Sequence, residues 1–239
     1  ILPEVRILES VLLFENHSEI DQVKEALFEH FSDQFESKGF VLLGFFESGS
    51  AYFYSKKPLN SPKQLKGLKM WTWKGDKVAE RFLKELSVSA FPLPVTDVNT
   101  GLETGMINAF YAPPLAAIAL QWYARVGYFL DYPLVNSIGA FLMNKRDFYR
   151  LSNKNQKILR TSVRKYCQTL VEQTRKENTE AKDIIQESGL EFIKPDSELI
   201  DFMKKSAQKA NQGNIPELYS QERFEQVEKL LKKIRANAS

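Results

Sequence analysis

LKGLKMWTW, Leu65 to Trp73, and LETGMINAFYAPP, Leu102 to Pro114, are the two stretches that decide the fold. Each places a short apolar or aromatic strand beside a turn that contains glycine, and residues 74–101 between them read as helix, strand and helix. This alternation predicts an α/β protein. Open α/β sheets bind ligands outside the carboxyl ends of their strands, so aromatic residues at these strand ends indicate a ligand cleft. The aromatic residues in question are Trp71, Trp73, Phe110 and Tyr111.

The composition is that of an ordinary globular protein. The 239 residues are 43% hydrophobic and 26% charged, a length that fits one large or two modest α/β domains. The alternation of helices and strands favours two lobes. No apolar run approaches the roughly 20 residues needed to cross a bilayer. Basic and acidic residues are interleaved, so the net charge of +3 indicates a solvated surface and not a nucleic-acid site.

The cysteine content and the first residue bear on the compartment. Cys167 is the single cysteine, which excludes an internal disulfide and fits either a cytosolic protein or a disulfide-free exported one. The chain starts with Ile1 and carries no signal-peptide pattern, so we expect a processed protein or a fragment.

Hydrophobic spacing predicts the elements of the first part of the chain. Ser18 to Lys38 carries apolar residues at steps of three and four, which predicts one amphipathic helix that ends at Gly39. The run FVLLGFF, Phe40 to Phe46, predicts a strand covered on both faces, in a parallel or mixed sheet. The sequence Ser48-Gly49-Ser50 is expected to break this strand.

The same spacing predicts the later elements. Asp76 is expected to cap a helix, and Gly105 to close the short helix over 98–104. Pro113 and Pro114 are expected to open a helix over 115–126, and 139–144 reads as a buried strand. No proline interrupts the periodic stretch 153–187, which predicts a helix roughly 50 Å long.

Signatures of catalysis and of metal binding are missing. The sequence contains no CxxC, no HExxH, no phosphate-binding glycine loop and no Ser/His/Asp order, and its only histidines are His17 and His30. Asp97 and Glu103 lie on one short helix, where a cap and a solvated charge explain them better than an acid–base pair. We therefore expect a binding protein and not an enzyme, with no cofactor and no metal. An enzyme with a nonstandard site stays open.

The blocks LKGLKMW, PLNSPKQ before it and GLETGMINAFYAPP after it resemble the extracytoplasmic solute-binding proteins of TRAP transporters, the DctP family. The similarity starts in LPEVRILESVLLF and continues through NKRDFYRLSNKNQKIL into the long helix. It implies a two-lobed, periplasmic-binding-protein-like α/β fold (type II-like), in which a long helix bridges the lobes. Lobe I would comprise 1–48, 138–176 and 206–239, and lobe II 49–137 and 177–205. A small ligand would bind between the lobes.

The resemblance also implies a role. Family members deliver small solutes, most often organic acids, to sodium-driven TRAP membrane subunits, so the chain is expected to be periplasmic. Members begin with further strands and helices that build much of lobe I and one wall of the cleft, and this sequence starts after them. The chain is then either a fragment or completed by another segment, which leaves room for an additional periplasmic partner protein.

The positions that bind the solute in the family have changed in this sequence. An arginine that forks onto the solute carboxylate corresponds to Trp71. A second common arginine corresponds to Ala51, beside Gly49 and Tyr52. The acid, glycine and asparagine near the closing proline correspond to Asn108, Ala109 and Ala112, so the acidic charge of that set is lost here.

These changes predict a different ligand. A buried carboxylate without a cationic or multiply donating partner costs several kcal/mol, and tryptophan cannot replace the bidentate arginine. Trp71 and Phe110 offer aromatic walls, with Trp73 and Tyr111 as further candidates. We expect a ligand that is apolar or lacks a carboxylate. A cation held by cation–π contacts near Glu47 is the variant left open, as is a ligand-sensing or assembly module without a transport role.

Overall fold

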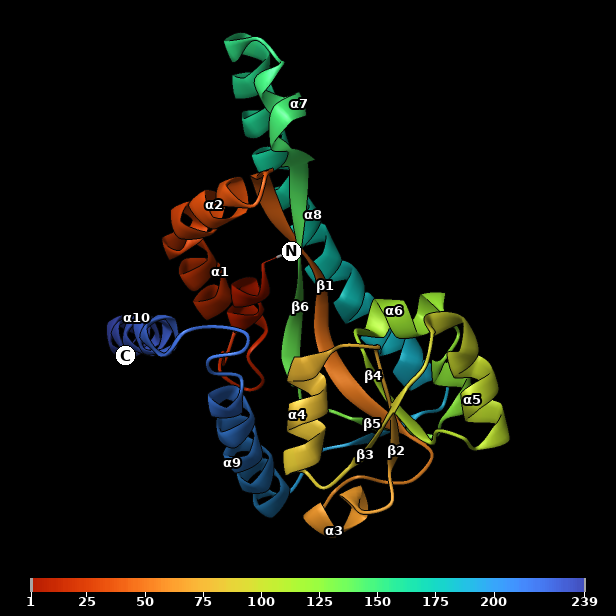
Figure 1. Ribbon diagram of the computed structural model, residues 1–239. Coiled ribbons are helices and arrows are strands. Elements are labelled where there is room, and N and C mark those ends of the chain that lie inside the picture. Colours follow the sequence, from red (N-terminus) through yellow and green to blue (C-terminus); the bar gives the residue numbers. More distant parts are fainter. Residues whose placement is uncertain (1, 239) are drawn as a thin grey trace.

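A single 16-residue strand, β1 (Phe40–Ser55), runs through both lobes of the computed structural model, which describes residues 2–238 (Figure 1). Its first part pairs antiparallel with β6 (Val135–Asn144). Its last residues lie between β4 (Ala109–Ala112) and β5 (Tyr128–Leu130). The two lobes are therefore joined by strands that each belong to both of them, which confirms the expected two-lobed α/β fold.

The second lobe is built on a mixed sheet in the order β3-β2-β4-β1-β5-β7. β2 (Lys69–Thr72) is parallel to β3 (Ser89–Pro92) and β4, and β5 is parallel to β7 (Glu191–Ile193), whereas β1 is antiparallel to its neighbours. Short helices complete this lobe: α3 (Pro62–Leu65), α4 (Lys77–Glu85), η2 (Val95–Asp97), α5 (Val98–Thr104), α6 (Pro114–Ala119), η3 (Tyr123–Arg125) and α9 (Ser197–Gly213).

The helices of the first lobe pack against the ribbon of β1 and β6 or against one another. These are η1 (Pro3–Glu9), α1 (His17–Ala26), α2 (Phe28–Ser37), α7 (Lys145–Tyr149) and α10 (Gln221–Ala238). Its core joins segments from both ends of the chain, because Ile7, Phe31, Leu42 and Val227 belong to one buried cluster.

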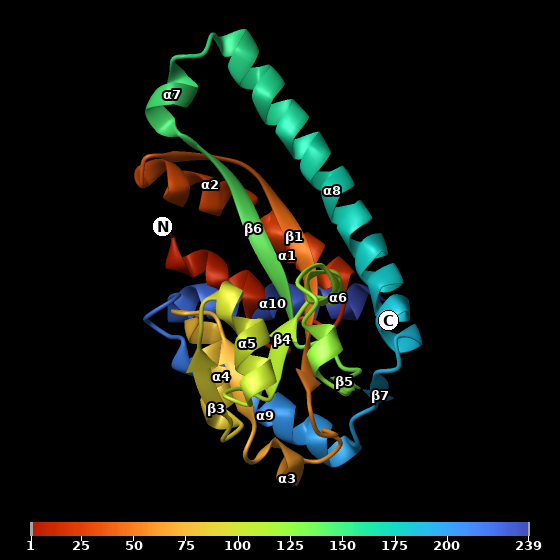
Figure 2. The same ribbon diagram turned by 90° about the vertical axis from the view of Figure 1, so that its right-hand side faces the viewer.

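The helix α8 (Asn153–Glu187) runs along both lobes, with the limits that the sequence predicts (Figure 2). Ser152 caps it, since its Oγ accepts a hydrogen bond from the Asn155 backbone N–H at 3.3 Å. The helix approaches β1 closely, because a Cβ at Gly44 would lie 2.6 Å from the Cys167 Sγ. A glycine at this position lets the strand and the helix touch.

Three other predictions are confirmed at the level of local structure. The sheet is mixed, Asp76 caps α4 by accepting a hydrogen bond from the Ala79 N–H at 3.3 Å, and Gly105 closes α5 with a φ of 74°.

The predicted boundary between the lobes at 205/206 falls inside α9, which packs on the second lobe as far as Ala210.

The prediction of one helix over Ser18–Lys38 is wrong, because the chain forms α1 and α2 with a break at Leu27. Leu27 leaves helical geometry with φ −101° and ψ 1° but keeps its N–H bonded to the Val23 carbonyl at 3.0 Å. Its side chain is buried with those of Val23 and Phe31, so the apolar spacing continues across the break. A periodic pattern alone cannot detect such a bend.

Three further expectations also fail. The strand β1 is not broken at Ser48-Gly49-Ser50 but continues to Ser55, since the glycine forms an irregularity in the pairing with φ 110°. β6 is only partly buried, and Phe141 is exposed. The helix after the prolines ends at Ala119 and not at 126, because Gln121 adopts a φ of 56°.

Candidate functional site

A cavity of about 960 Å³ lies between the two lobes. The hinge strands β1 and β6 contribute Ala51, Phe53 and Val135, and the first lobe contributes η1. The second lobe contributes the end of β2, the start of α4 and the end of β4. Apolar side chains dominate the wall, among them Leu2, Val5, Val11, Phe35, Val78, Phe82, Leu83, Val95, Leu120, Leu134, Ile138 and Leu142. This volume suits a small molecule.

An aromatic wall on the second lobe consists of Trp71, Trp73 and Tyr111, and Trp122, which packs on Trp71, also borders the cavity. The Trp71 ring lies 6.2 Å from that of Trp73, 5.6 Å from that of Tyr111 and 4.8 Å from that of Trp122, measured between centroids. Trp71 is 4% exposed and Trp73 is 56% exposed. Residues two apart on a strand point to the same side, which explains why both tryptophans reach the cavity.

The polar groups of Trp71 and Tyr111 already have partners within the protein. The Trp71 Nε1–H donates to the Leu93 carbonyl at 2.9 Å, and the Tyr111 hydroxyl donates to the Asp76 Oδ2 at 2.7 Å. Burial raises the pKa of Tyr111 far above its ordinary value, and the charge of Asp76 adds to this shift. The wall therefore presents mainly aromatic surface to a ligand.

Among residues 2–238, Arg6 is the one arginine that lines the cavity, and two carboxylates neutralise it. The Arg6 Nη2 lies 2.6 Å from the Asp76 Oδ1, and its Nε lies 2.7 Å from the Glu9 Oε2. The other Glu9 oxygen accepts a hydrogen bond from the Ile138 N–H at 2.9 Å. Because Arg6 is on η1 and Asp76 caps α4, the ion pair also links the two lobes.

The environment changes the pKa of both Arg6 and Glu9. Burial raises the pKa of the Glu9 carboxyl, and the nearby Arg6 guanidinium only partly opposes this effect. Burial by itself would lower the pKa of Arg6, but the charges of Glu9 and Asp76 outweigh it, so the pKa of Arg6 is raised. The guanidinium thus stays charged with carboxylates on two sides, which leaves it little capacity for an anionic ligand.

One further cation borders the cavity. Lys74 follows Trp73 at the turn before α4, and its side chain is exposed. Within residues 2–238, no carboxylate is paired with it. A solvated lysine at the rim is a much weaker clamp for an anion than a buried arginine fork.

The structure brings four of the eight residues proposed from the sequence to this cavity: Ala51, Trp71, Trp73 and Tyr111. Phe110 is fully buried on another face of the sheet, where its ring stacks on Tyr54 at 4.5 Å. Asn108 lies outside the cavity and accepts a hydrogen bond from the Lys69 N–H at 2.8 Å. Tyr52 borders a separate, smaller cavity of about 100 Å³.

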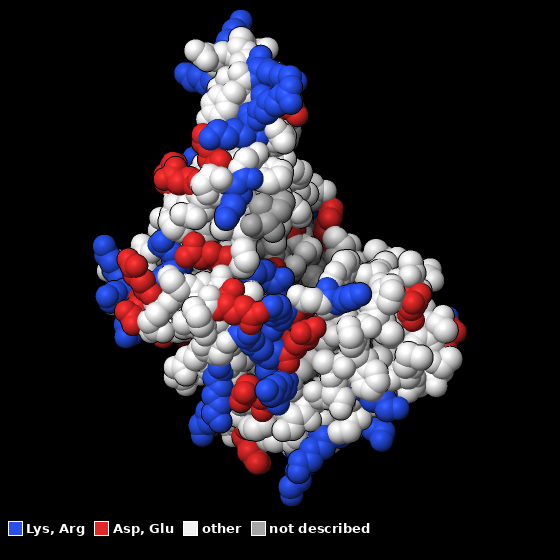
Figure 3. All heavy atoms as spheres, in the orientation of Figure 1, with Lys and Arg blue, Asp and Glu red and all other residues white. Residues whose placement is uncertain are grey.

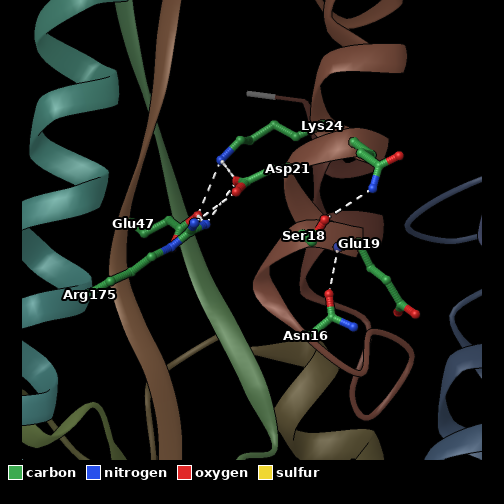
Figure 4. A network of polar contacts seen from close by, with 8 residues as sticks. Asn16, Ser18, Glu19, Asp21, Lys24, Glu47 and Arg175 are labelled. Carbon is green, nitrogen blue, oxygen red and sulfur yellow. Dashed lines mark hydrogen bonds and ion pairs between the residues drawn. The ribbon is translucent and has the colours of Figure 1, made fainter. Parts of the chain in front are cut away.

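Glu47 also lies outside the main cavity, in an ion-pair network beside the hinge (Figure 4). Its Oε1 is 2.6 Å from the Arg175 Nη2 and 3.2 Å from the Lys24 Nζ, and Arg175 also pairs with Asp21 at 2.7 Å. These contacts join α8, β1 and α1. Burial acts to raise the pKa of Glu47, but Arg175 and Lys24 prevail and lower it.

The network makes stability dependent on pH. Because the folded-state pKa of Glu47 is lowered, its carboxylate stabilises the fold above the pKa of the unfolded chain, and this stabilisation disappears as the pH falls through the folded-state pKa. We expect Glu47→Gln to lower the free energy of unfolding by about 3 kcal/mol at pH 7 and to flatten its decline below about pH 4. Urea unfolding at a series of pH values measures both effects. The exposed Glu29→Gln is the control, and a decline as steep in Glu47→Gln as in the wild type would contradict the assignment.

The sequence reasoning missed Arg6 and Glu9 and treated Asp76 only as a helix cap. Arg6 and Glu9 are three residues apart, which is the spacing of a local ion pair. Asp76 is 70 positions from Arg6, and no local pattern could reveal that contact. Within residues 2–238, no group of three or more His, Cys, Asp or Glu side chains could hold a metal ion, and no helix is long and apolar enough to cross a membrane.

Comparison with protein families gives a match over most of the chain. The sequence model described as bacterial extracellular solute-binding protein, family 7 (DctP), matches residues 1–217. Solved structures match over nearly the whole chain. A TRAP periplasmic solute-binding protein from Desulfovibrio desulfuricans with bound sn-glycerol-3-phosphate is 22% identical, with a TM-score of 0.87 over 95% of this chain and 74% of that one.

Two other solved structures are similar to the same extent. DctP7 of Bordetella pertussis, an extracytoplasmic solute receptor that binds pyroglutamic acid, is 16% identical with a TM-score of 0.87, over 97% of this chain and 75% of that one. A TRAP periplasmic solute-binding protein from Haemophilus influenzae with bound L-gulonate is 19% identical with a TM-score of 0.85, over 98% and 75%. At these identities the likeness establishes the fold and not the ligand.

Proposed function

The chain belongs to the DctP family of bacterial extracellular solute-binding proteins, and on this basis we propose that it captures a small solute between its lobes and delivers it to TRAP membrane subunits outside the cytoplasm. The cavity between the lobes, with walls from both and a floor of hinge strands, supports this role. No group in the proposed mechanism performs chemistry on the solute.

The proposed solute is apolar or lacks a carboxylate. The observation that carries this proposal is the pairing of Arg6 with Glu9 and Asp76, which uses the charge of the cavity's arginine inside the protein. An anionic solute would have to displace one of these carboxylates or leave its own charge without a buried partner. Two of the solved relatives are named with carboxylic acids, L-gulonate and pyroglutamic acid, and the ligand class proposed for this chain differs from theirs.

Capture is proposed to proceed by closure of the lobes. The two hinge strands cross between the lobes, and a solute against the aromatic wall of the second lobe also meets η1 of the first. Such a solute shifts the equilibrium toward the closed form only by its preference for that form. Arg6 and Asp76 lie on opposite lobes, so their ion pair also favours the closed arrangement.

Native mass spectrometry of the purified protein tests this function. We expect a retained solute whose mass, after release, corresponds to a neutral apolar compound, and we expect the wild type to retain more of it than Trp73→Ala does. Removing the exposed Trp73 ring shrinks the aromatic wall with little damage to the core. The matched control is Tyr166→Ala. It also removes an exposed aromatic ring, but this ring is on α8 and does not line the cavity. Recovery of a carboxylic acid would refute the proposed ligand class.

A further inference from the structure

Positive charge is concentrated at one end of the molecule, in residues 144–166, here called the basic tip. This segment holds eight Lys or Arg residues and a single acid, Asp147, although the whole chain carries only +3. It comprises the end of β6, α7 and the first turns of α8, which project beyond the body of the first lobe (Figures 1 and 2). In the space-filling view, Lys and Arg side chains cover much of this end (Figure 3).

Half of these cations have neither an ion pair nor an aromatic ring contact among residues 2–238. The four are Arg146, Lys154, Lys157 and Lys165, and all are exposed. The others contact groups of the first lobe or of the tip itself: Lys145 pairs with Glu36 at 3.2 Å, Arg150 with Asp147 at 3.4 Å and Arg164 with Glu25, and Arg160 lies over the Phe148 ring at 4.6 Å. The basic tip therefore carries positive charge that is not neutralised by ion pairs within the protein.

The unpaired lysines share one face of α8. Lys154, Lys157, Ile158 and Lys165 follow steps of three, four and seven residues, which place them along one side of a helix. Ile158 is 53% exposed between the lysines, and Tyr166, which follows Lys165 on the neighbouring side of the helix, is 70% exposed. The outer face of α8 at the tip is thus cationic, with the apolar side chain of Ile158 among the charges and an exposed aromatic ring at its margin.

We propose that the basic tip docks on a membrane surface through anionic phospholipid headgroups. Lysine is depleted in protein–protein interfaces, and the apolar residues here are scattered and form no hydrophobic centre for a protein partner. A lipid surface does not disfavour lysine and does not need a hydrophobic centre on the protein. Mobile phosphates accept flexible ammonium groups, and tyrosine and isoleucine side chains can enter the boundary between headgroups and acyl chains. This docking does not depend on which solute occupies the cavity.

Co-sedimentation with vesicles tests the proposal. We expect the full chain to sediment with phosphatidylglycerol vesicles and not with pure phosphatidylcholine vesicles, and to be released as the salt concentration rises. In the variant Lys154→Gln/Lys157→Gln/Lys165→Gln, the partition coefficient should fall roughly 100-fold. The matched control Lys204→Gln/Lys205→Gln/Lys209→Gln removes the same charge from exposed positions on α9 and should bind like the wild type.

Three results would overturn the proposal. The first is a wild type that does not sediment with phosphatidylglycerol vesicles at low salt, and the second is an equal loss in the tip variant and the α9 variant. The third is a wild type that does not bind vesicles but binds detergent-solubilised membrane subunits through the three tip lysines. That result would mean that the basic tip docks on an acidic protein surface. Circular dichroism spectra of both variants establish that they fold.

Discussion

Replacement of Trp71 by alanine is expected to lower the free energy of unfolding by about 3 to 5 kcal/mol. The indole is 4% exposed, touches the rings of Trp73, Tyr111 and Trp122, and donates its N–H to the Leu93 carbonyl. Alanine would leave a hole between these rings and leave that carbonyl without its donor. Urea unfolding followed by circular dichroism measures the loss.

Trp73→Ala is the matched control for this substitution, because it removes the same side chain two residues further along the chain. Trp73 is 56% exposed, so we expect a loss of less than about 1 kcal/mol. Trp71→Phe keeps an aromatic ring in the wall, so its comparison with Trp71→Ala separates an effect on stability from an effect on solute binding. Equal losses for Trp71→Ala and Trp73→Ala would show that the Trp71 ring is not the packed centre of the wall.

The double substitution Glu9→Gln/Asp76→Asn is expected to raise the affinity for carboxylate solutes about 10- to 100-fold. Both replacements are close in shape to the residues they replace. A glutamine in place of Glu9 can still accept the Ile138 N–H, and an asparagine in place of Asp76 can still cap α4, so local structure should survive. What changes is charge, because Arg6 would then have no carboxylate beside it and could pair with a solute. Calorimetric titration with carboxylate solutes measures the gain.

Arg6 identifies the source of any such gain. Adding Arg6→Gln to the double variant should return carboxylate affinity to the level of the wild type. Persistence of the gain in the triple variant would place the anion elsewhere, for instance at Lys74 on the rim of the cavity. No gain in the double variant would mean that the pairing of Arg6 does not determine the ligand class.

Sequence reasoning succeeded where the decisive interactions are local. The limits of α8 follow from uninterrupted periodicity between the Ser152 cap and Gly189, and the start of α4 follows from the Asp76 cap. The proposed aromatic wall stays a prediction for ligand binding, but its geometry follows from local sequence, because Trp71 lies in β2 and Trp73 comes directly after the strand, two residues on. Both side chains then reach the same side of the sheet.

Sequence reasoning failed where tertiary packing decides. The bend at Leu27 preserves the spacing of buried residues, and Gly49 lets β1 continue where a break was expected. Phe110 alternates with Tyr111 along β4 and therefore faces the core, while Glu47 is held by Arg175, 128 positions away. The pairing of Arg6 with Asp76 likewise joins segments that only the folded chain brings together.

The central claim is that the cavity neutralises its own arginine and so selects a solute without a carboxylate. The most direct test is calorimetric titration of the wild type with matched pairs, in which one hydrocarbon skeleton is offered as the carboxylate and as the neutral amide. We expect the neutral member to bind at least about tenfold more tightly, because it requires no buried counter-charge. Tighter binding of the carboxylate member by the wild type would contradict the account.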